Sequence, residues 1–517
     1  MENNRSSWGS NLGFLLAAIG SAVGLGNIWG FPFKMGKSGG FTFLVIYLLL
    51  AVFVGMIIMV SELAVGRKTK LNPIDAYQKI SKKFKWIGWL ATIAPFMIMS
   101  FYSVLGGYCL QYVALNLSEL SFGGGLIAVG GADAFNAIRT QPFGAVVFTA
   151  LFMIICMVIV QGGVDSGIEK FNKVGMPALF VMLVIIIIRS LTLPNAVEGL
   201  KFMFVPGYAV AAGYISEAPD IVTVLGTAGG QMFFSLSLAM GAILTYGSYL
   251  SKEENLVKNS AIIVFADTLI AIMAGIAVIP ASVSHGLSQG LSPADIADGL
   301  GGPGLLFVTL QNVFSHMGKI GPLFGTIFYV LVLIAAISSA ISLMETVSAH
   351  WIDKDLQKGE TDTRKKIVLI VSLLIMLEAV VVAADGLGKS SFTPAALLGI
   401  QGDVPDVLAD WLDFMDTFSE YLLMPLGAML MALMIGWELD PGIVLDEVGH
   451  GNHSKGFASF YKLCIKFIVP VVMAFVLAGS LKGNCGGSAT MWYILAGIAL
   501  VGFWIFAAVG NKKKAEE

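Results

Sequence analysis

The stretch GSAVGLGNIWGFPF, residues 20–33, decides the fold of this chain. It lies inside the first strongly apolar segment, yet it contains four glycines, an asparagine and a proline. Glycine and proline destabilise the interior of a helix, by about 1 and 3 kcal/mol per residue. We therefore expect a membrane-crossing helix that is broken within this stretch and leaves backbone groups free inside the protein.

The composition indicates a polytopic membrane protein. Of the 517 residues, 56% are hydrophobic and only 13% are charged, which is too apolar for a soluble protein of this length. The net charge of −3 provides no basic field, so nucleic acid is excluded as a partner. The four cysteines, Cys109, Cys156, Cys464 and Cys485, lack metal-ligand spacing. No nucleophile–base set or nucleotide-binding loop is present, so we do not expect an enzyme.

About twelve apolar segments are long enough to cross the hydrocarbon of a bilayer. The expected spans are 11–35, 41–65, 87–118, 143–161, 168–191, 222–250, 257–283, 322–351, 366–384, 411–437, 458–480 and 490–509. Their apolar runs are continuous and do not alternate, so we predict helices and not a barrel. The fold class is an all-α integral membrane bundle, built as a single domain over residues 1–517.

The loop charges predict the orientation. The connection after the second span contains one arginine and six lysines, whereas the connection 119–142 contains only Arg139. Positive loops face the cytoplasm, so both termini are expected there, in the inner (cytoplasmic) membrane of a cell. The first apolar segment has no small-residue cleavage site, and we expect it to be retained. The long outer connections 192–221, 284–321 and 385–410 are candidate lids.

A second interrupted span is AGGQMFFSLSLAMGAILTYGSY, residues 228–249, in the sixth helix. Breaks in the first and sixth helices suggest two inverted repeats of five helices, 11–191 and 222–437, followed by two additional helices in 458–509. Freed carbonyls coordinate cations, and the N-termini of half-helices receive anionic groups. The two breaks therefore predict a site for a zwitterion and a cation.

Seven stretches resemble the neurotransmitter:sodium symporters, and within them the prokaryotic amino-acid transporters related to the bacterial leucine transporter. The stretches are SAVGLGNIW with FPF, GGFTFLVIYLL, SELAVGR, QMFFSLSLAMG, ADTLIAIMAGIAVIPA, GPGLLFVTL and AAISSAISLMETV. The resemblance extends over roughly residues 5–510. It implies sodium-coupled uptake of an amino acid by alternating access, with two sodium ions.

The resemblance also implies which residues bind. Hard oxygen donors suit an alkali cation. For the first sodium ion they belong to Ala22, Asn27, Ser235 and Asp267, with the substrate carboxylate. For the second they belong to Gly20, Val23, Ala335, Ser338 and Ser339. The residues implied around the substrate are Ala22, Gly24, Leu25, Gly26, Ile98, Tyr102, Phe234, Ser235, Ser237, Met240 and Leu343.

Gly24 and Asp267 bear on the class of substrate and on the need for chloride. The amine transporters of the family have an aspartate at the place of Gly24, so glycine there favours amino acids. Asp267 lies in an apolar span, where a buried carboxylate is costly unless it is paired or metal-bound. Chloride-dependent relatives have a neutral residue near this place, so we expect transport that needs no chloride. The alternative role of Asp267 is to hydrogen-bond a neighbouring helix.

The resemblance also implies residues that close the binding site toward each side of the membrane, called gates here. The outer gate departs from the family pattern. Relatives read NIWRFP, with an arginine that pairs with an aspartate on the tenth helix, but this chain has Gly30. Asp413 matches the aspartate, and Lys34, one turn beyond Gly30, is a candidate replacement for the arginine. On the inner side, the resemblance implies a gate formed by Arg5, Trp8, Tyr249 and Asp353.

Ile98, Phe234, Met240 and Leu343 favour a hydrophobic or aromatic substrate. The expected partners are that amino acid and the lipid bilayer, with the chain a monomer or a weak homodimer. A proton-coupled transporter of the same architecture, with Asp267 as proton carrier, and a sensor that binds without transporting stay open as alternatives. Glu62, Glu345 and Glu378 lie near expected span ends, where they are interpreted as snorkelling or helix-tethering charges, and they receive no transport role. His285 and His316 lack a partner pattern and are expected to be surface histidines.

Overall fold

The computed structural model describes residues 7–123, 130–360, 363–400, 402, 404–449, 455–486 and 488–509. These residues form helices joined by turns and loops, and no strand occurs within the described ranges. The elements of the membrane-crossing segments are α1 (Asn11–Ala22), η1 (Gly26–Gly30), α2 (Phe31–Lys37), α3 (Phe41–Leu50), η2 (Ala51–Gly55), α4 (Met56–Thr69), α6 (Ile87–Phe122), α8 (Pro142–Gln161), η4 (Val164–Glu169), α9 (Lys170–Leu191), α12 (Ile221–Ser235), α13 (Ala242–Ser248), α14 (Leu256–Ser288), α17 (Gly321–Gln357), α18 (Arg364–Asp385), α21 (Trp411–Asp416), η7 (Thr417–Leu423), α22 (Met424–Leu433), η8 (Met434–Glu438), α24 (Lys455–Leu463), η9 (Cys464–Ile468), α25 (Val469–Cys485) and α26 (Ala489–Ala508).

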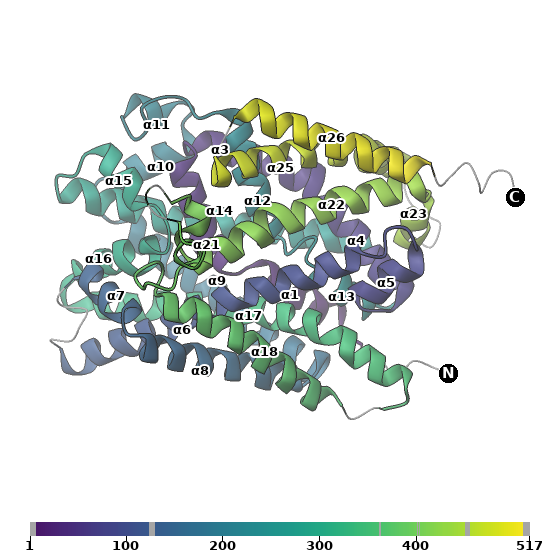
Figure 1. The fold of residues 1–517 in the computed structure, drawn as a ribbon. Helices are drawn as coiled ribbons and strands as arrows, with labels where there is room; N and C mark the ends of the chain where they lie inside the picture. Colours follow the sequence, from purple (N-terminus) through teal and green to yellow (C-terminus); the bar gives the residue numbers. More distant parts are fainter. Residues whose placement is uncertain are drawn as a thin grey trace, which may run out of the picture.

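Shorter helices join these segments at the two ends of the bundle (Figure 1). The helices used below are α5 (Pro73–Ile80), α7 (Gly131–Arg139), α10 (Ala196–Phe204), α11 (Tyr208–Ala211), α15 (Pro293–Gly299), η5 (Leu305–Thr309), α16 (Leu310–Ser315) and α23 (Gly442–Gly449). In Figure 1, α5 and α23 lie at one end, whereas α7, α10, α11, α15 and α16 lie at the other. The lysine-rich connection that includes α5 is therefore at the end of the bundle opposite α7, α10, α11, α15 and α16.

The expected all-α membrane fold is confirmed, with a change in the count of spans. Ten helices of the described chain are long and apolar enough to cross a membrane, and a bent pair, Asn11–Ala22 with Gly26–Lys37, makes an eleventh. The expected span 222–250 is not one helix, because α12 ends at Ser235 and α13 begins at Ala242. Each half is too short to cross hydrocarbon, which requires about 20 helical residues.

The halves of the broken sixth span pack against other spans through glycines. α13 contacts α4, where a β carbon on Gly66 would lie 2.1 Å from the Leu244 carbonyl oxygen. A β carbon on Gly247 would lie 2.9 Å from the Leu63 backbone. Only glycine permits backbones to approach so closely, as at many helix contacts in membranes. α13 is thereby held directly on α4.

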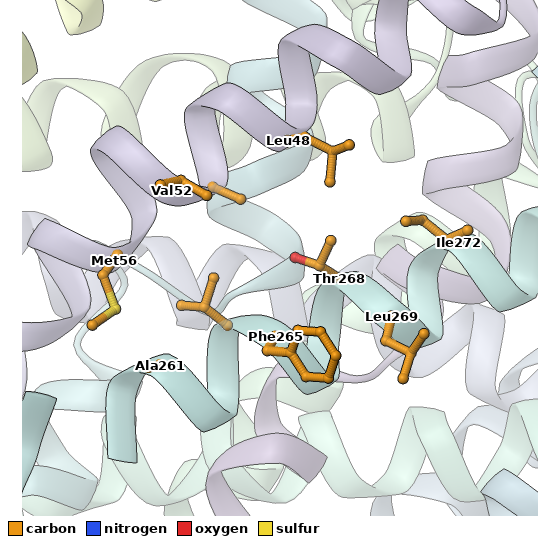
Figure 2. A pocket seen from close by; sticks show the side chains of 10 residues that line it. Leu48, Val52, Met56, Ala261, Phe265, Thr268, Leu269 and Ile272 are labelled. Atoms are coloured by element: carbon orange, nitrogen blue, oxygen red, sulfur yellow. The ribbon is translucent and has the colours of Figure 1, made fainter. Parts of the chain in front are cut away.

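A large apolar groove lies on the surface between the second and seventh spans (Figure 2). Its volume is about 440 Å³, and its lining contains one polar side chain, Thr268. Val52 and Phe265 are more than half exposed at its edges. Both walls belong to membrane-crossing helices, so hydrocarbon chains of the bilayer can fill the groove. It lacks the convergent polar groups of a site for a polar ligand.

We predict that Gly66→Ala lowers the stability of the fold. The added methyl group meets the Leu244 backbone, and overpacking of this kind costs about 1–3 kcal/mol. The measurement is the midpoint of thermal unfolding of the purified protein in detergent. The control is Gly144→Ala in α8, where a β carbon meets nothing within 4 Å. Equal midpoints for Gly66→Ala and the unchanged protein would contradict the close contact.

Candidate functional site

The first break exposes backbone groups that side chains then satisfy. α1 ends at Ala22, and Val23 has an extended backbone before η1 begins at Gly26. The amide of Gly24 donates to Asn27 Oδ1 (3.0 Å), and that of Leu25 donates to the Tyr102 hydroxyl (3.0 Å). The Gly26 carbonyl accepts from Gln231 Nε2 at 2.7 Å. These bonds stabilise an interruption that would otherwise leave polar groups unpaired in an apolar interior.

The second break is held from two neighbouring helices. Between α12 and α13 the backbone is left-handed at Ser237 (φ 53°), Ala239 (φ 58°) and Gly241 (φ 74°). Side-chain-bearing residues rarely adopt this conformation, which costs about 1–2 kcal/mol per residue. The Ser237 hydroxyl donates to the Ser21 carbonyl at 2.7 Å, and the Ala239 amide donates to Glu62 Oε2 at 3.3 Å. The two breaks are thus in direct contact.

The position of Glu62 differs from the expectation. It is not a snorkelling charge near the end of a span, but is fully buried within α4, where it tethers the backbone of the second break. The expectation placed it by its distance from the predicted end of the span at residue 65. The helix extends to Thr69 and the break lies beside it, so Glu62 holds a backbone amide of the site.

Asp267 is the centre of a buried polar cluster. Its carboxylate accepts from Asn27 Nδ2 (2.7 Å) and from the Ser235 hydroxyl (2.9 Å). The Tyr47 hydroxyl donates to the same carboxylate at 3.3 Å. Three residues expected at the first sodium ion are therefore brought together from η1, α12 and α14. The alternative role of Asp267 is also present, since its carboxylate is hydrogen-bonded to three neighbouring elements, η1, α3 and α12.

A second group of oxygens joins α1 to α17. The Ser338 hydroxyl donates to the Ala335 carbonyl (2.8 Å) and lies 3.3 Å from the Val23 carbonyl. The Ser339 hydroxyl donates to the Ser21 carbonyl (3.0 Å) and lies 3.4 Å from the Gly20 carbonyl. All five residues expected at the second sodium ion contribute oxygens to this group. Such a cluster of hard neutral donors fits an alkali cation and not a soft metal.

A narrow, nearly closed cavity lies between the two breaks. Its lining residues are Ser21, Ala22, Gly24, Gly26, Ile98, Tyr102, Phe234, Ser237, Met240, Ser339 and Leu343. Nine of these were expected around the substrate, while Leu25 and Ser235, also expected, are not in the lining. Leu25 nevertheless bonds Tyr102, and Ser235 bonds Asp267. The walls combine apolar side chains with a few hydroxyl and backbone groups.

The absence of a side chain at Gly24 leaves space between Ser339 and Tyr102 in the cavity wall. A β carbon there would lie 2.3 Å from Ser339 Oγ and 2.5 Å from the Tyr102 hydroxyl. Any side chain at this position would therefore displace a residue of the cavity wall. The absence of a side chain leaves room for the Tyr102 hydroxyl to accept from the Leu25 amide.

Lys34 has a different partner from the one expected. It forms a buried ion pair with Glu420 of η7, and its ammonium lies 5.3 Å from the Tyr421 ring centroid and 6.0 Å from that of Phe234. The expected pairing with Asp413 is wrong, because Glu420 lies about two turns farther along and nearer the cavity. The amide of Asp413 is capped by the Asp410 carboxylate at 2.7 Å.

On the opposite side of the cavity, aromatic residues close around α13. Trp8 Nε1 donates to the Tyr246 carbonyl at 3.1 Å, and its ring lies 6.4 Å from that of Tyr249. The Tyr249 hydroxyl donates to Glu345 at 2.8 Å, and Glu345 pairs with Arg364. Glu345 is therefore fully buried in this network and not near a span end, as α17 continues to Gln357.

Arg5 and Asp353 are the two charged residues of the expected inner gate. Arg5 lies outside the described residues. Asp353 accepts from both the backbone amide and the side-chain amide of Asn72, each at 2.9 Å. Asp353 thus fixes the turn before α5, whatever further partner it has.

Sequence reasoning missed Tyr47, Gln231, Glu420 and Arg364. Tyr47 is a single hydroxyl in the run FTFLVIYLLL, and Glu420 is a single carboxylate inside the expected span 411–437. An isolated polar residue in a membrane span is a signal of function or of polar pairing. The signal does not name the partner, which lies 188 residues away for Tyr47 and Ser235.

Comparisons with known proteins agree with this architecture. The model of the "Sodium:neurotransmitter symporter family" matches residues 5–123 and 138–393. The uncharacterized sodium-dependent transporter YhdH of Bacillus subtilis (strain 168) is 34% identical over 480 residues, covering 92% of this chain and 97% of its own. An uncharacterized sodium-dependent transporter of Haemophilus influenzae is 30% identical over 506 residues, covering 93% and 99%.

A solved structure is similar to this chain in both fold and sequence. It is MhsT in complex with L-phenylalanine, with a TM-score of 0.78 and 34% sequence identity. The match covers 92% of this chain and 100% of that chain. The likeness therefore extends over nearly all of the described helices.

We predict that breaking the Lys34–Glu420 pair destabilises the fold more than removing it. Lys34→Met leaves Glu420 buried without its cation, which is expected to cost about 3–5 kcal/mol. Adding Glu420→Gln to Lys34→Met removes both charges and is expected to recover most of that loss. The measurement is the thermal midpoint in detergent.

The matched control for this pair is Lys37→Met, on the exposed side of the same helix. Its midpoint is expected to stay within a degree or two of the unchanged protein, since single surface changes alter stability by about 0.5 kcal/mol or less. A double variant no more stable than Lys34→Met alone would show that the two charges are not coupled.

Proposed function

Because this chain belongs to the sodium:neurotransmitter symporter family and is a sodium-coupled membrane transporter, we propose that it imports a hydrophobic or aromatic amino acid by alternating access. It is a transporter and not an enzyme. The observation that carries the proposal is the cavity between the two broken spans, where apolar walls face freed backbone amides. MhsT, the solved structural neighbour, holds L-phenylalanine, which supports an aromatic substrate.

The cavity suits an amino acid at both of its ends. The substrate carboxylate would meet the amides of Leu25 and Gly26 and the Tyr102 hydroxyl, since backbone amides at the start of a half-helix attract anions. The substrate side chain would lie among Ile98, Phe234 and Met240, which line the cavity. Methionine is an adaptable wall and can admit large apolar side chains.

Two sodium ions would bind at the oxygen clusters beside the cavity. The first would take Ala22, Asn27, Ser235 and Asp267, with the substrate carboxylate completing the shell. The second would take Gly20, Val23, Ala335, Ser338 and Ser339. A shared carboxylate makes the binding of substrate and of the first ion mutually favourable. A membrane potential adds about 2.3 kcal/mol per charge per 100 mV, so two ions could drive strong accumulation.

Asp267 is proposed to make chloride unnecessary. It places a fixed negative charge beside the first sodium site, where an anion would otherwise balance the cation. Its carboxylate is fully buried and is bonded by three neutral side chains, so a bound cation would supply its missing counter-charge.

Closure is proposed to depend on different contacts at the two ends of the cavity. At the outer end, the Lys34–Glu420 pair beside Phe234 takes the place of the arginine that relatives have at position 30. At the inner end, Trp8, Tyr249, Glu345 and Arg364 form one network. Asp353 and Arg5 are proposed to complete this inner gate.

The arrangement in the membrane follows from the same proposal. The two breaks support inverted repeats over 11–191 and 222–437, with residues 458–509 forming two additional helices. The lysine-rich connections support a cytoplasmic location for both termini, in a chain that lies in the inner membrane of a cell. The assembly state is proposed to be a monomer or a weak homodimer.

Uptake into proteoliposomes tests the function. We predict that an inward sodium gradient drives accumulation of labelled phenylalanine, tryptophan or leucine, while an equal choline gradient does not. A proton gradient that drives uptake without sodium would establish the proton-coupled alternative. Binding without accumulation would establish a sensor. Replacing chloride by gluconate is expected to leave uptake unchanged.

Asp267→Asn tests the role of the carboxylate. The variant keeps a side chain of equal size but removes the charge, so we predict at least a tenfold rise in the sodium concentration for half-maximal uptake. Tenfold corresponds to about 1.4 kcal/mol of lost cation binding. Ser61→Ala, which removes a hydroxyl that bonds Tyr461 and the Ile57 carbonyl elsewhere in the bundle, is the matched control. An unchanged sodium dependence in Asp267→Asn would refute direct ligation.

A further inference from the structure

Two histidines meet at the end of the bundle that contains α15 and α16. His285 lies in the last turn of α14, and His316 follows the last residue of α16. Their ring centroids are 4.7 Å apart, and the ring planes are inclined by 59°. They were expected to be surface histidines without a partner pattern, but the fold of the connection brings together these two residues, which are 31 positions apart. His285 is half-buried and His316 is exposed.

The hydrogen bonding of His316 fixes which ring nitrogen carries the hydrogen. Its Nδ1 lies 2.8 Å from the Asn312 carbonyl oxygen. A carbonyl oxygen can only accept, so Nδ1 carries the hydrogen and Nε2 of the neutral ring has a lone pair. Metal-binding histidines very often donate their second nitrogen to a backbone carbonyl in this way. His316 is thus oriented as a metal ligand would be.

The spacing of the rings also fits a shared metal ion. Two imidazoles that each bind zinc at about 2.0–2.1 Å, with a tetrahedral angle between them, have centroids about 5 Å apart. The observed separation of 4.7 Å is close to this value. The Gln289 side chain lies one turn beyond His285, with its amide 3.5 Å from His316 Nε2, where its oxygen could act as a third donor. The C-terminus of the long helix α14 adds partial negative charge.

We propose that His285 and His316 form a binding site for a divalent transition-metal ion such as Zn²⁺, with Gln289 and water completing the shell. Neutral imidazole is a preferred ligand of zinc, copper and nickel, whereas magnesium and calcium require oxygen. Among the described residues, no group of three or more His, Cys, Asp or Glu side chains is placed to hold a metal. The proposed site therefore has two imidazole ligands from the protein, and not the three or four protein ligands of a structural or catalytic zinc site.

A metal at this position would restrain the connection between α14 and α17. The connection is already attached to the broken first span, because the Gly302 carbonyl accepts from Trp29 Nε1 at 2.9 Å. It is also attached to α6 through the Phe307 carbonyl and the Tyr112 hydroxyl (2.7 Å). His285 and His316 are at the two ends of this connection. An ion shared between them would fix both ends together and slow any motion of the connection.

Metal binding by the purified full-length protein tests the site directly. Zn²⁺ is titrated in competition with a chromogenic chelator, in a background where His450→Ala and His453→Ala remove the histidines outside the described residues. We expect one ion per chain, and at least tenfold weaker binding in His285→Ala and in His316→Ala. Lys319→Ala, exposed in the same connection, is the control that should bind as the background does. An excess of Mg²⁺ should not compete.

The site is refuted if the background binds no zinc, or if both histidine variants bind it equally well. Thermal midpoints of the variants confirm that they are folded. The restraint has a separate test, which rests on the proposed transport function: Zn²⁺ added outside proteoliposomes should reduce uptake at least twofold in the background but not in His316→Ala. Zinc that binds without changing uptake would refute the restraint alone. Absence of uptake in every sample would refute the proposed function and leave the binding result standing.

Discussion

The structure depends on the need to satisfy backbone groups that are freed inside an apolar bundle. No water is present in hydrocarbon to bond them, so each break in a span requires polar partners from other helices. Asn27, Tyr102 and Gln231 serve the first break, while Glu62 and the Ser21 carbonyl hold the second. The polar side chains at the centre of the bundle thus have a structural reason, and the same groups provide the donors that a cation and a zwitterion need.

The sequence predicts the parts of this arrangement that depend on local composition. The glycines of residues 20–33 and the interruption in 228–249 indicate both breaks, and the length of the apolar runs indicates the spans. The side chains expected near the breaks do converge, because a break that faces the bundle interior forces its neighbours to face one another. The resemblance to a family, and not spacing alone, assigned them to separate cation and substrate sites.

The pairings between distant residues were not predictable in the same way. Lys34 was expected to meet Asp413 because only one carboxylate was identified by resemblance, but the chain places Glu420 where the ammonium can reach it. Tyr47 and Arg364 reach their partners across the bundle, and no local pattern encodes those distances. The histidine contact depends on how a connection of about thirty residues folds back. Such contacts are set by the packing of whole helices.

Gly24 has a consequence for how the chain can diversify. A β carbon at this position would lie 2.3 Å from Ser339 Oγ, so even the smallest side chain would disturb a residue of the proposed second cation site. Relatives that transport amines have an aspartate at this place. A protein that acquired this aspartate by one substitution would have impaired binding at the proposed cation site before it could bind a new substrate. A side chain at this position would therefore need compensating changes at Ser339 of α17 and at Tyr102 of α6, so the glycine limits which substitutions the chain can accept one at a time.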